Sequence, residues 1–301
     1  MYRTILALIS VGIFSWMTVA SAQMSSTNYL IRWDTISTGG SDTSTSSSFQ
    51  LRDTVGNTAT GDSDSSSYQM AAGYRQGVFD PLVTFDVFSQ LTTSGRAATA
   101  VSGNTITAAT NGLSAGDYIV LLQDQGAGQI SAIGRIVSAG GGTIVVDELK
   151  DGGTAPTIDG SNDYVYLLEG MNADLDTLDA AIVSAAVIGF QVRTDAGNGY
   201  VVQALVNGKL RDGANDIDDV GDGAVTVGSE EYGGRSSDTS IAGSTFDTAD
   251  TAFSTSSQDV ADESSYTFQS RNFLTLKASI DGSTADGSYE QSLALIASVN
   301  F

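Results

Sequence analysis

The chain has 301 residues, a formal net charge of −22 at pH 7, and neither cysteine nor histidine. These features exclude a disulfide framework, nucleophiles activated by histidine, and imidazole metal ligands. The negative charge also excludes nucleic acid and anionic membranes as partners, because both bind basic surfaces. Cations, polycationic surfaces and further copies of the chain remain compatible partners.

Glycine, serine, threonine and aspartate dominate the chain, whereas proline and lysine are scarce. Short runs of alternating apolar residues recur between turns that are rich in these small residues, and helix formers never accumulate for long. The pattern predicts an all-β fold: an antiparallel β-sandwich with an inserted small β-barrel and an N-terminal arm of β-strands.

The first 22 residues have the three parts of a secretory signal peptide. Arg3 supplies the positive start, residues 5–19 the apolar core, and Ala20-Ser21-Ala22 the cleavage site. A membrane anchor is the alternative, but the core is short for a spanning helix and no positive cluster follows it. We therefore expect a secreted protein of the extracellular cell surface that begins at Gln23, with no membrane insertion after cleavage.

Residues 23–80 form a serine-, threonine- and glycine-rich arm with a weak internal repeat. Each repeat has a serine-rich start, a short strand of alternating large residues and a turn, and its aromatic position recurs about every twenty residues. The arm provides either successive strands of one small sheet or an extended segment that adds strands to a partner, and residues 38–48 can also be a flexible linker. The residues expected to anchor an added strand are Tyr29, Ile31, Trp33, Phe49 and Leu51.

Residues 95–170 are predicted to form the small closed barrel, because their short apolar strands are separated by glycine-rich turns at a regular spacing. Residues 81–94 and 171–301 then supply the strands of the sandwich. The runs 118–122 and 164–168 lack polar alternation, so both of their faces should be covered.

One helix is predicted, over residues 171–186, with apolar residues at helical spacing: Leu175, Leu178 and Ile182. Its aspartates would complement the positive end of the helix dipole. The alternative is a connecting segment that enters a strand near Val187.

Two β-hairpins are predicted in the sandwich. The first spans residues 188–208 and turns at residues 195–199, with Ile188, Phe190 and Val192 on one face. The second joins residues 266–280 to residues 289–301, with Leu274 and Leu276 on one face. Since a lone hairpin is marginal in water, each must recruit further strands to bury its apolar face.

An acidic stretch follows the first predicted hairpin and contains the best metal candidates in the chain. Calcium takes carboxylate and carbonyl oxygens from flexible, glycine-containing loops, so the residue types fit, although the spacing matches no EF-hand loop. Either a bound calcium ion or a solvated acidic loop accounts for the stretch. The candidate ligands are Asp212, Asn215, Asp216, Asp218, Asp219 and Asp222.

Catalytic residues are not expected. The adjacent pair Glu230 and Glu231 invites a glycosidase hypothesis, but neighbouring side chains on a strand point to opposite faces and cannot easily flank one glycosidic bond. We therefore expect no enzymatic activity and no cofactor other than calcium.

The C-terminal half resembles secreted bacterial surface β-sandwich proteins of the pilin-like, matrix-fibre and cell-wall-associated type. The likeness rests on Gly199-Tyr200, the L-x-x-G of residues 210–213, the E-Y-G turn of residues 231–233 and the closing strand pattern of residues 287–301. It covers residues 188–301 best. The resemblance implies a structural or adhesive surface protein.

The function expected from these observations is that of an exported structural protein that self-assembles. An N-terminal arm from one copy would complete the open sheet of the next, and a head-to-tail contact of this kind produces a filament or tube. The alternative is a monomeric adhesion module that binds carbohydrate, such as a surface polysaccharide, or another surface. A monomer whose arm folds back on its own sandwich remains equally open.

Overall fold

The computed structural model describes residues 82–300 in full and, before them, only the backbone of six short strands. The chain divides into two compact units, residues 1–80 and 81–301, and each is described by itself. Strands make up 47% of the structure and helix 1%, which confirms the all-β prediction. The predicted signal peptide lies outside the described residues.

Three separate two-stranded antiparallel sheets occur in the first unit, so the single small sheet predicted as one alternative is not formed by these strands. Of the predicted arm anchors, Ile31 lies in β2 and Leu51 in β4, whereas Tyr29, Trp33 and Phe49 lie outside the described residues. The strands are β1 (Met24–Ser25), β2 (Leu30–Ile31), β3 (Gly39–Thr45), β4 (Gln50–Val55), β5 (Gly61–Asp64) and β6 (Gln69–Ala72).

The second unit contains a sandwich of two antiparallel sheets. The first sheet has the order β19 (Glu231–Ser236), β21 (Thr267–Ser279), β15 (Ser184–Thr194) and β7 (Val83–Ser89). The second has the order β20 (Gln258–Glu263), β16 (Tyr200–Val206) and β22 (Leu293–Val299). Their inner faces share one core, in which Phe190, Tyr200 and Leu274 are buried.

Neither predicted hairpin forms. β15 and β16 belong to different sheets, as do β21 and β22, so each connection crosses the core as an arch instead of joining neighbours in one sheet. The predicted faces are nevertheless those that turn inward: Ile188, Phe190 and Val192 meet the apolar face of β16 across the core. Alternation identifies the buried face of a strand but not the strand with which it pairs.

Two short arches fix how the sheets are aligned. Residues 195–199 link β15 to β16, and residues 264–266 link β20 to β21. Since a short arch holds its two strands one above the other, β16 lies over β15 and β20 over β21. The strand order of the two sheets then places β22 over β7, with both at the same side of the sandwich.

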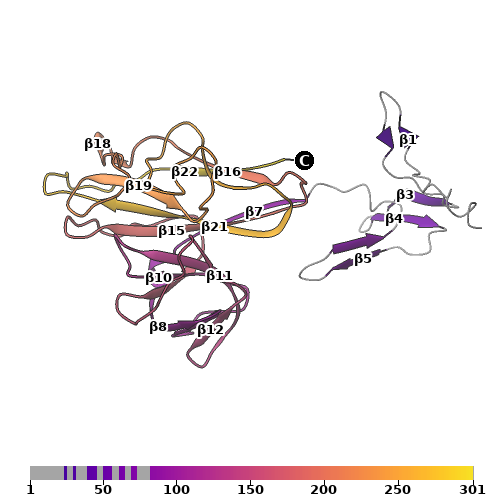
Figure 1. The fold of residues 1–301 in the computed structure, drawn as a ribbon, viewed down its shortest axis with the longest axis horizontal. Helices are drawn as coiled ribbons and strands as arrows, with labels where there is room; N and C mark the ends of the chain where they lie inside the picture. Colours follow the sequence, from indigo (N-terminus) through magenta and orange to yellow (C-terminus); the bar gives the residue numbers. More distant parts are fainter. Residues whose placement is uncertain are drawn as a thin grey trace, which may run out of the picture. The chain divides into compact units, whose positions relative to one another are not determined.

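The barrel comes from strands between residues 96 and 168 and lies below the sandwich in Figure 1. Its six-stranded circle runs β10-β14-β8-β9-β12-β11 and closes through pairing of β11 with β10. Ile106, Ile119 and Leu121 fill the interior with no exposed surface. The strands are β8 (Arg96–Ser102), β9 (Thr105–Ala108), β10 (Tyr118–Gln123), β11 (Ile130–Gly140), β12 (Thr143–Val146) and β14 (Tyr164–Leu168), and β13 (Lys150–Asp151) pairs with β11 outside the circle.

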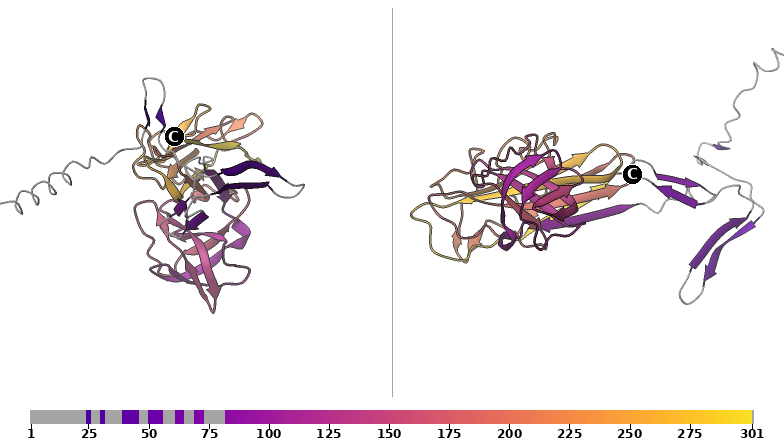
Figure 2. Two further views of the ribbon diagram at one scale, coloured as in Figure 1. Left: turned by 90° about the vertical axis from the view of Figure 1, so that its right-hand side faces the viewer. Right: turned by 90° about the horizontal axis from the view of Figure 1, so that it is seen from below.

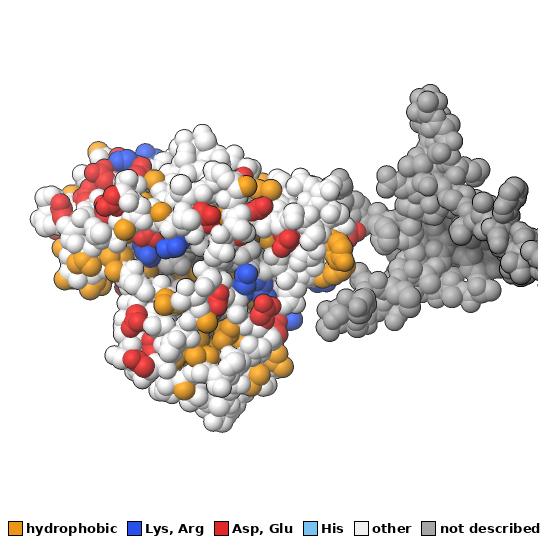
Figure 3. Space-filling model, viewed as in Figure 1, with side chains coloured by type: hydrophobic (Ala, Val, Ile, Leu, Met, Phe, Trp, Pro, Cys, Tyr) orange, Lys and Arg blue, Asp and Glu red, His pale blue; other side chains and the backbone are white. Residues whose placement is uncertain are grey.

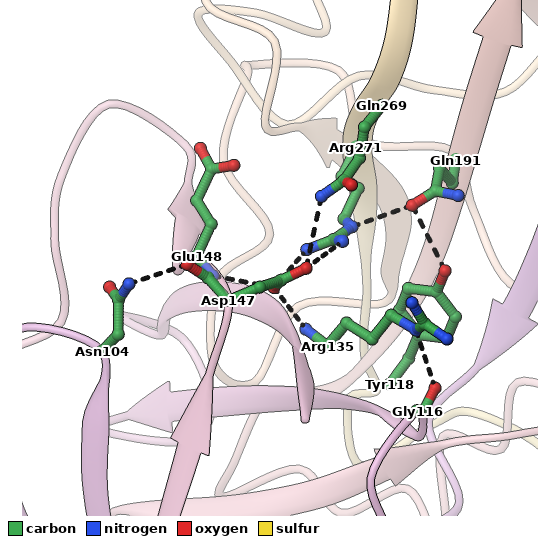
Figure 4. A network of polar contacts seen from close by, with 9 residues as sticks. All are labelled: Asn104, Gly116, Tyr118, Arg135, Asp147, Glu148, Gln191, Gln269 and Arg271. Atoms are coloured by element: carbon green, nitrogen blue, oxygen red, sulfur yellow. Dashed lines mark hydrogen bonds and ion pairs between the residues drawn. The ribbon is translucent and has the colours of Figure 1, made fainter. Parts of the chain in front are cut away.

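The barrel is inserted between β7 and β15, which are neighbours in the first sheet, and it packs against the outer face of that sheet (Figure 2). Figure 4 shows the polar contacts at this junction, where the Arg271 guanidinium donates two hydrogen bonds to Asp147, at 2.7 and 2.5 Å, and a third to Gln191. The Tyr118 ring stacks on Phe88, with centroids 4.3 Å apart. The barrel is therefore attached through both apolar and charged contacts.

The predicted helix over residues 171–186 is wrong. Residues 171–183 are an irregular segment that leads into β15 at Ser184, as the alternative prediction expected. Asp174 and Asp179 each accept a hydrogen bond from the backbone N–H two residues later, at 2.8 and 2.7 Å. Such side-chain-to-backbone bonds compete with helix formation.

Candidate functional site

The outer edge of β7 is not paired along most of its length with any strand between residues 82 and 300. The N–H of Gln90 points to β15 and donates to Val187 at 2.8 Å, whereas the N–H of Ser89 points away and donates to Gly170 at 3.1 Å. By this alternation the N–H and C=O groups of Phe85 and Val87 also point away from β15. Within the described part of the chain they have no backbone partner.

β22 has the same kind of free edge. Asn300 and Ser292 direct their backbone groups to the loops that flank β16, so the odd-numbered residues between them direct theirs outward. No strand described in the structure pairs with that side of β22. The free edge therefore consists of Leu293, Leu295, Ala297 and Val299.

The same residues that leave their backbone groups free also turn their side chains toward the core. Phe85 and Val87 of β7, and all four of those residues of β22, pack against the core but are only half-buried. Val83, at the end of β7, is 41% exposed. We use the name open seam for the side of the sandwich where these residues of β7 and β22 lie, one strand from each sheet.

β22 lacks the usual protection of an edge strand. Natural edges carry charged residues, proline or bulges that prevent pairing with another chain. β22 has the sequence LALIASV, with no charge and no proline, and its pairing with β16 shows no bulge. Its outward-facing Ile296 is 47% exposed. By contrast, β7 carries exposed Asp86, and its edge is already bonded at Ser89.

The opposite side of the sandwich is covered. The outer edge of β19 is paired with flanking loops, for example between Tyr232 and Asp218 and twice between Gly234 and Thr251, at 2.8 to 2.9 Å. Phe246 and Phe253 from those loops are buried against the core. We call this the covered side.

A cavity of about 680 Å³ lies at the end of the sandwich opposite the arches. Core residues form its apolar floor, including Ile188, Leu276 and Leu293, and Leu293 also belongs to the open seam. The bordering segments, residues 171–178 and 284–291, contribute four acidic residues: Asp174, Asp176, Asp286 and Glu290.

Tyr232 is a further residue that lines this cavity. Its side chain is 3% exposed, and its hydroxyl has no hydrogen-bond partner among the described residues. Burial, with a smaller contribution from the charge of Asp219, raises the pKa of the Tyr232 hydroxyl, so the group stays neutral. A neutral donor without a partner is available to an acceptor that enters the cavity.

The predicted calcium ligands do not converge. Asp212 and Asn215 lie in the small hairpin of β17 (Arg211–Asp212) and β18 (Asn215–Asp216). Asp218 forms an ion pair with Lys209 at 2.8 Å, and the Asp222 carboxylate accepts a backbone hydrogen bond from Ala224.

Burial, followed by the charges of neighbouring aspartates, raises the pKa of Asp219, while Lys209 opposes that shift. Across residues 82–300, no three acidic side chains are placed to hold one metal ion. Acidic side chains gather near β18 on the face shown in Figure 3. The calcium site stays a prediction.

Glu230 and Glu231, which are not expected to be catalytic, have different hydrogen-bond partners. Glu230 accepts a hydrogen bond from Thr284, and Glu231 accepts two from Thr226, at 3.0 and 3.1 Å. Each is thus occupied in a local turn.

The sequence does not predict the open seam, because the alternation of residues 289–301 equally suits one arm of a hairpin. The signal that could have revealed it is the uncharged alternation of residues 293–299, which lacks any edge protection.

No protein-family model, curated protein or solved structure matches this chain. In the part of the chain that the structure describes, no helix is long and apolar enough to cross a bilayer.

Proposed function

We propose that this chain is an exported structural surface protein that polymerises by β-strand addition, with the arm of residues 23–80 from one copy entering the open seam of the next. The observation that carries the proposal is the coincidence of two free strand edges and half-buried core side chains on one side of the sandwich. An added strand would satisfy the backbone groups and complete the burial at the same time.

The arm has the sequence that such a strand needs. Tyr29, Ile31 and Trp33 alternate and so share one face of an extended segment, and Phe49 and Leu51 repeat the pattern. This face would meet the inward side chains of the seam. Completing the burial of each half-buried apolar side chain is worth about 1 kcal/mol.

The connection between arm and sandwich allows exchange between copies. In the sequence, segments rich in serine, threonine, glycine and aspartate separate both candidate donor strands from β7. A donor that enters the seam of a second copy makes a head-to-tail contact, which does not close on itself and extends into a fibre. A donor that folds back on its own sandwich gives a monomer.

The test compares the mature chain with a copy that lacks residues 23–53 and with an Ala297→Pro variant. The N–H of Ala297 points outward, so proline removes no hydrogen bond of the monomer but blocks the edge. We expect filaments by negative-stain microscopy for the unaltered chain and their loss in both variants, with the melting temperature of the proline variant changed by only a few degrees.

Ala297→Val is the matched control, because it adds a side chain at the same position but keeps the N–H. It should still form filaments. A monodisperse monomer for the unaltered mature chain under all conditions would exclude self-assembly.

A monomeric adhesion module is the second candidate, and a specific feature favours it. Tyr266, in the arch between β20 and β21, and Phe268, at the start of β21, are 61% and 39% exposed, with ring centroids 5.8 Å apart. Exposed aromatic rings of this kind can stack on sugar rings. Retention of the mature chain on a polysaccharide array, lost in Tyr266→Ala, would support this function.

A further inference from the structure

The arm carries an arginine directly after two of its apolar anchors, in Ile31-Arg32 and Leu51-Arg52. On an extended strand, adjacent side chains point to opposite faces. When the anchor turns inward, the arginine therefore turns outward, away from the core.

The direction of the added strand follows from β22. The sheets of the sandwich are antiparallel throughout, and β22 runs from Leu293 at the cavity to Val299 at the arches. A donor antiparallel to β22 would run from the arches toward the cavity. Its C-terminal end, which carries the arginine, would arrive at the cavity.

The cavity suits that end of a polypeptide strand. Its floor is apolar and accepts the anchor side chain, while Asp286 and Glu290 on its border are both exposed and offer negative charge to an outward-facing arginine. Tyr232 also lines the cavity, and its hydroxyl, which has no hydrogen-bond partner among the described residues, can donate to a main-chain carbonyl, which a strand brings and a hydrocarbon does not.

Resting on the strand addition proposed above, we propose that the cavity is the docking site for the arginine-bearing end of a donor strand from a second copy. The anchor next to the arginine covers the apolar floor, either Leu51 before Arg52 or Ile31 and Trp33 on the two sides of Arg32, and the arginine pairs with Asp286 and Glu290 at the border. This contact fixes the direction and the register of the donor.

A charge-swap experiment on the full mature chain tests the proposal, with the critical concentration for assembly measured by light scattering. We expect Arg32→Glu with Arg52→Glu, and separately Asp286→Lys with Glu290→Lys, to raise the critical concentration about tenfold or more. Combining all four changes should restore it to within about threefold of the unaltered chain, because opposite charges again meet.

Two further variants separate this contact from general charge effects. Glu148→Lys makes the same kind of change at an exposed barrel residue and should leave the critical concentration unchanged. Tyr232→Phe removes a hydroxyl that has no partner among the described residues, so it should raise the critical concentration about threefold without lowering the melting temperature.

The outcomes distinguish this inference from the proposed function. Loss of assembly on deleting residues 23–53, with no effect of the arginine and border changes, would keep strand addition and overturn the cavity contact. Charge reversals that weaken assembly but are not rescued in combination would also overturn it. An unaltered chain that never assembles would overturn both.

Discussion

The two sides of the sandwich are built from the same kinds of strand but differ in whether their edge strands are paired and covered. On the covered side, the backbone edge of β19 is bonded to loops, and Phe246 and Phe253 bury the core beneath them. On the open seam, β7 and β22 have backbone groups without a partner among the described residues, together with half-buried apolar side chains. The barrel shows the same capacity for closure, since its strands form a complete circle.

The difference between the two sides shows that loops of this chain can pair with an edge strand and cover the core beside it, as they do at β19. An edge that stays open beside a sealed one is therefore a candidate interaction surface and not a general failure of packing. The predictions below test how sharply the two sides differ.

The largest effect is expected from the buried ion pair of the covered side. Lys277 and Asp250 lie 3.1 Å apart with side chains 11% and 6% exposed, and Asp250 also accepts the Val225 N–H. Asp250→Ala would leave a buried charge unpaired and should lower the free energy of unfolding by about 3–5 kcal/mol, measured by urea denaturation.

The exposed pair Lys209 and Asp218 provides the control for this prediction. Its side chains are 38% and 69% exposed, so Asp218→Ala should cost less than about 1 kcal/mol. Equal costs for the two variants would show that the covered side is no better sealed than the surface.

Matched phenylalanine truncations compare the two sides directly. Phe246 on the covered side is 1% exposed, whereas Phe85 on β7 is only half-buried. In the monomer, Phe246→Ala should cost about 3–5 kcal/mol and Phe85→Ala about half as much, by thermal or urea unfolding. If Phe85→Ala costs as much as Phe246→Ala in a chain shown to be monomeric, the seam is not open in solution.

The junction with the barrel adds a smaller, pH-dependent effect on the outer face of the first sheet. Burial alone would raise the pKa of Asp147, but hydrogen bonds from Arg271 and from the Arg135 N–H, together with the Arg271 charge, hold this pKa below its usual value. The carboxylate therefore stabilises the fold above about pH 4, and this contribution is lost as the pH falls through the lowered pKa.

Asp147→Asn should accordingly be less stable than the unaltered chain at pH 7, by about 1 kcal/mol because solvent screens this partly exposed carboxylate, and the gap should close as the pH falls through the lowered pKa. Unfolding measured across this pH range checks the sign. A gap that is independent of pH would assign the loss to packing instead of to charge.

Calcium should have the smallest effect. Because the candidate acids do not converge and Asp218 already pairs with Lys209, we expect chelator to change the melting temperature by less than about 1 °C. A rise in melting temperature with calcium that disappears in Asp216→Asn would instead support the calcium site predicted from the sequence.

The buried faces of the strands were predictable from the sequence, but their partners were not. Ile188, Phe190 and Val192 alternate in the same way whether a strand turns into a hairpin or crosses into a second sheet. The turn residues do not distinguish a hairpin from an arch either, since Gly199, with a φ of +73°, is compatible with both connections. A side chain at Gly199 would meet the carbonyl of Glu263, the last residue of β20, a contact that only the folded chain reveals.

The false helix has a similar origin. Leu175 and Leu178 do pack against the core, as a helical stripe would, but they do so from an irregular segment. The hydrogen bonds from the backbone to the aspartate side chains favour an irregular conformation over a helix. The spacing of the apolar residues carries no information about these hydrogen bonds. The cavity was equally hidden, because its walls come from segments far apart in the sequence.

The insertion of the barrel between two adjacent strands also bears on how the chain folds. β7 and β15 pair directly, with Ser89 opposite Ile188, although the whole barrel separates them in sequence. Half of the pairings in the barrel circle join strands that follow one another, namely β8 with β9, β10 with β11 and β11 with β12, so they close short loops at low entropic cost. A barrel that folds first would bring the ends of β7 and β15 together and shorten the search for their pairing. The rate at which the sandwich forms would then depend on the stability of a domain that contributes no strand to it.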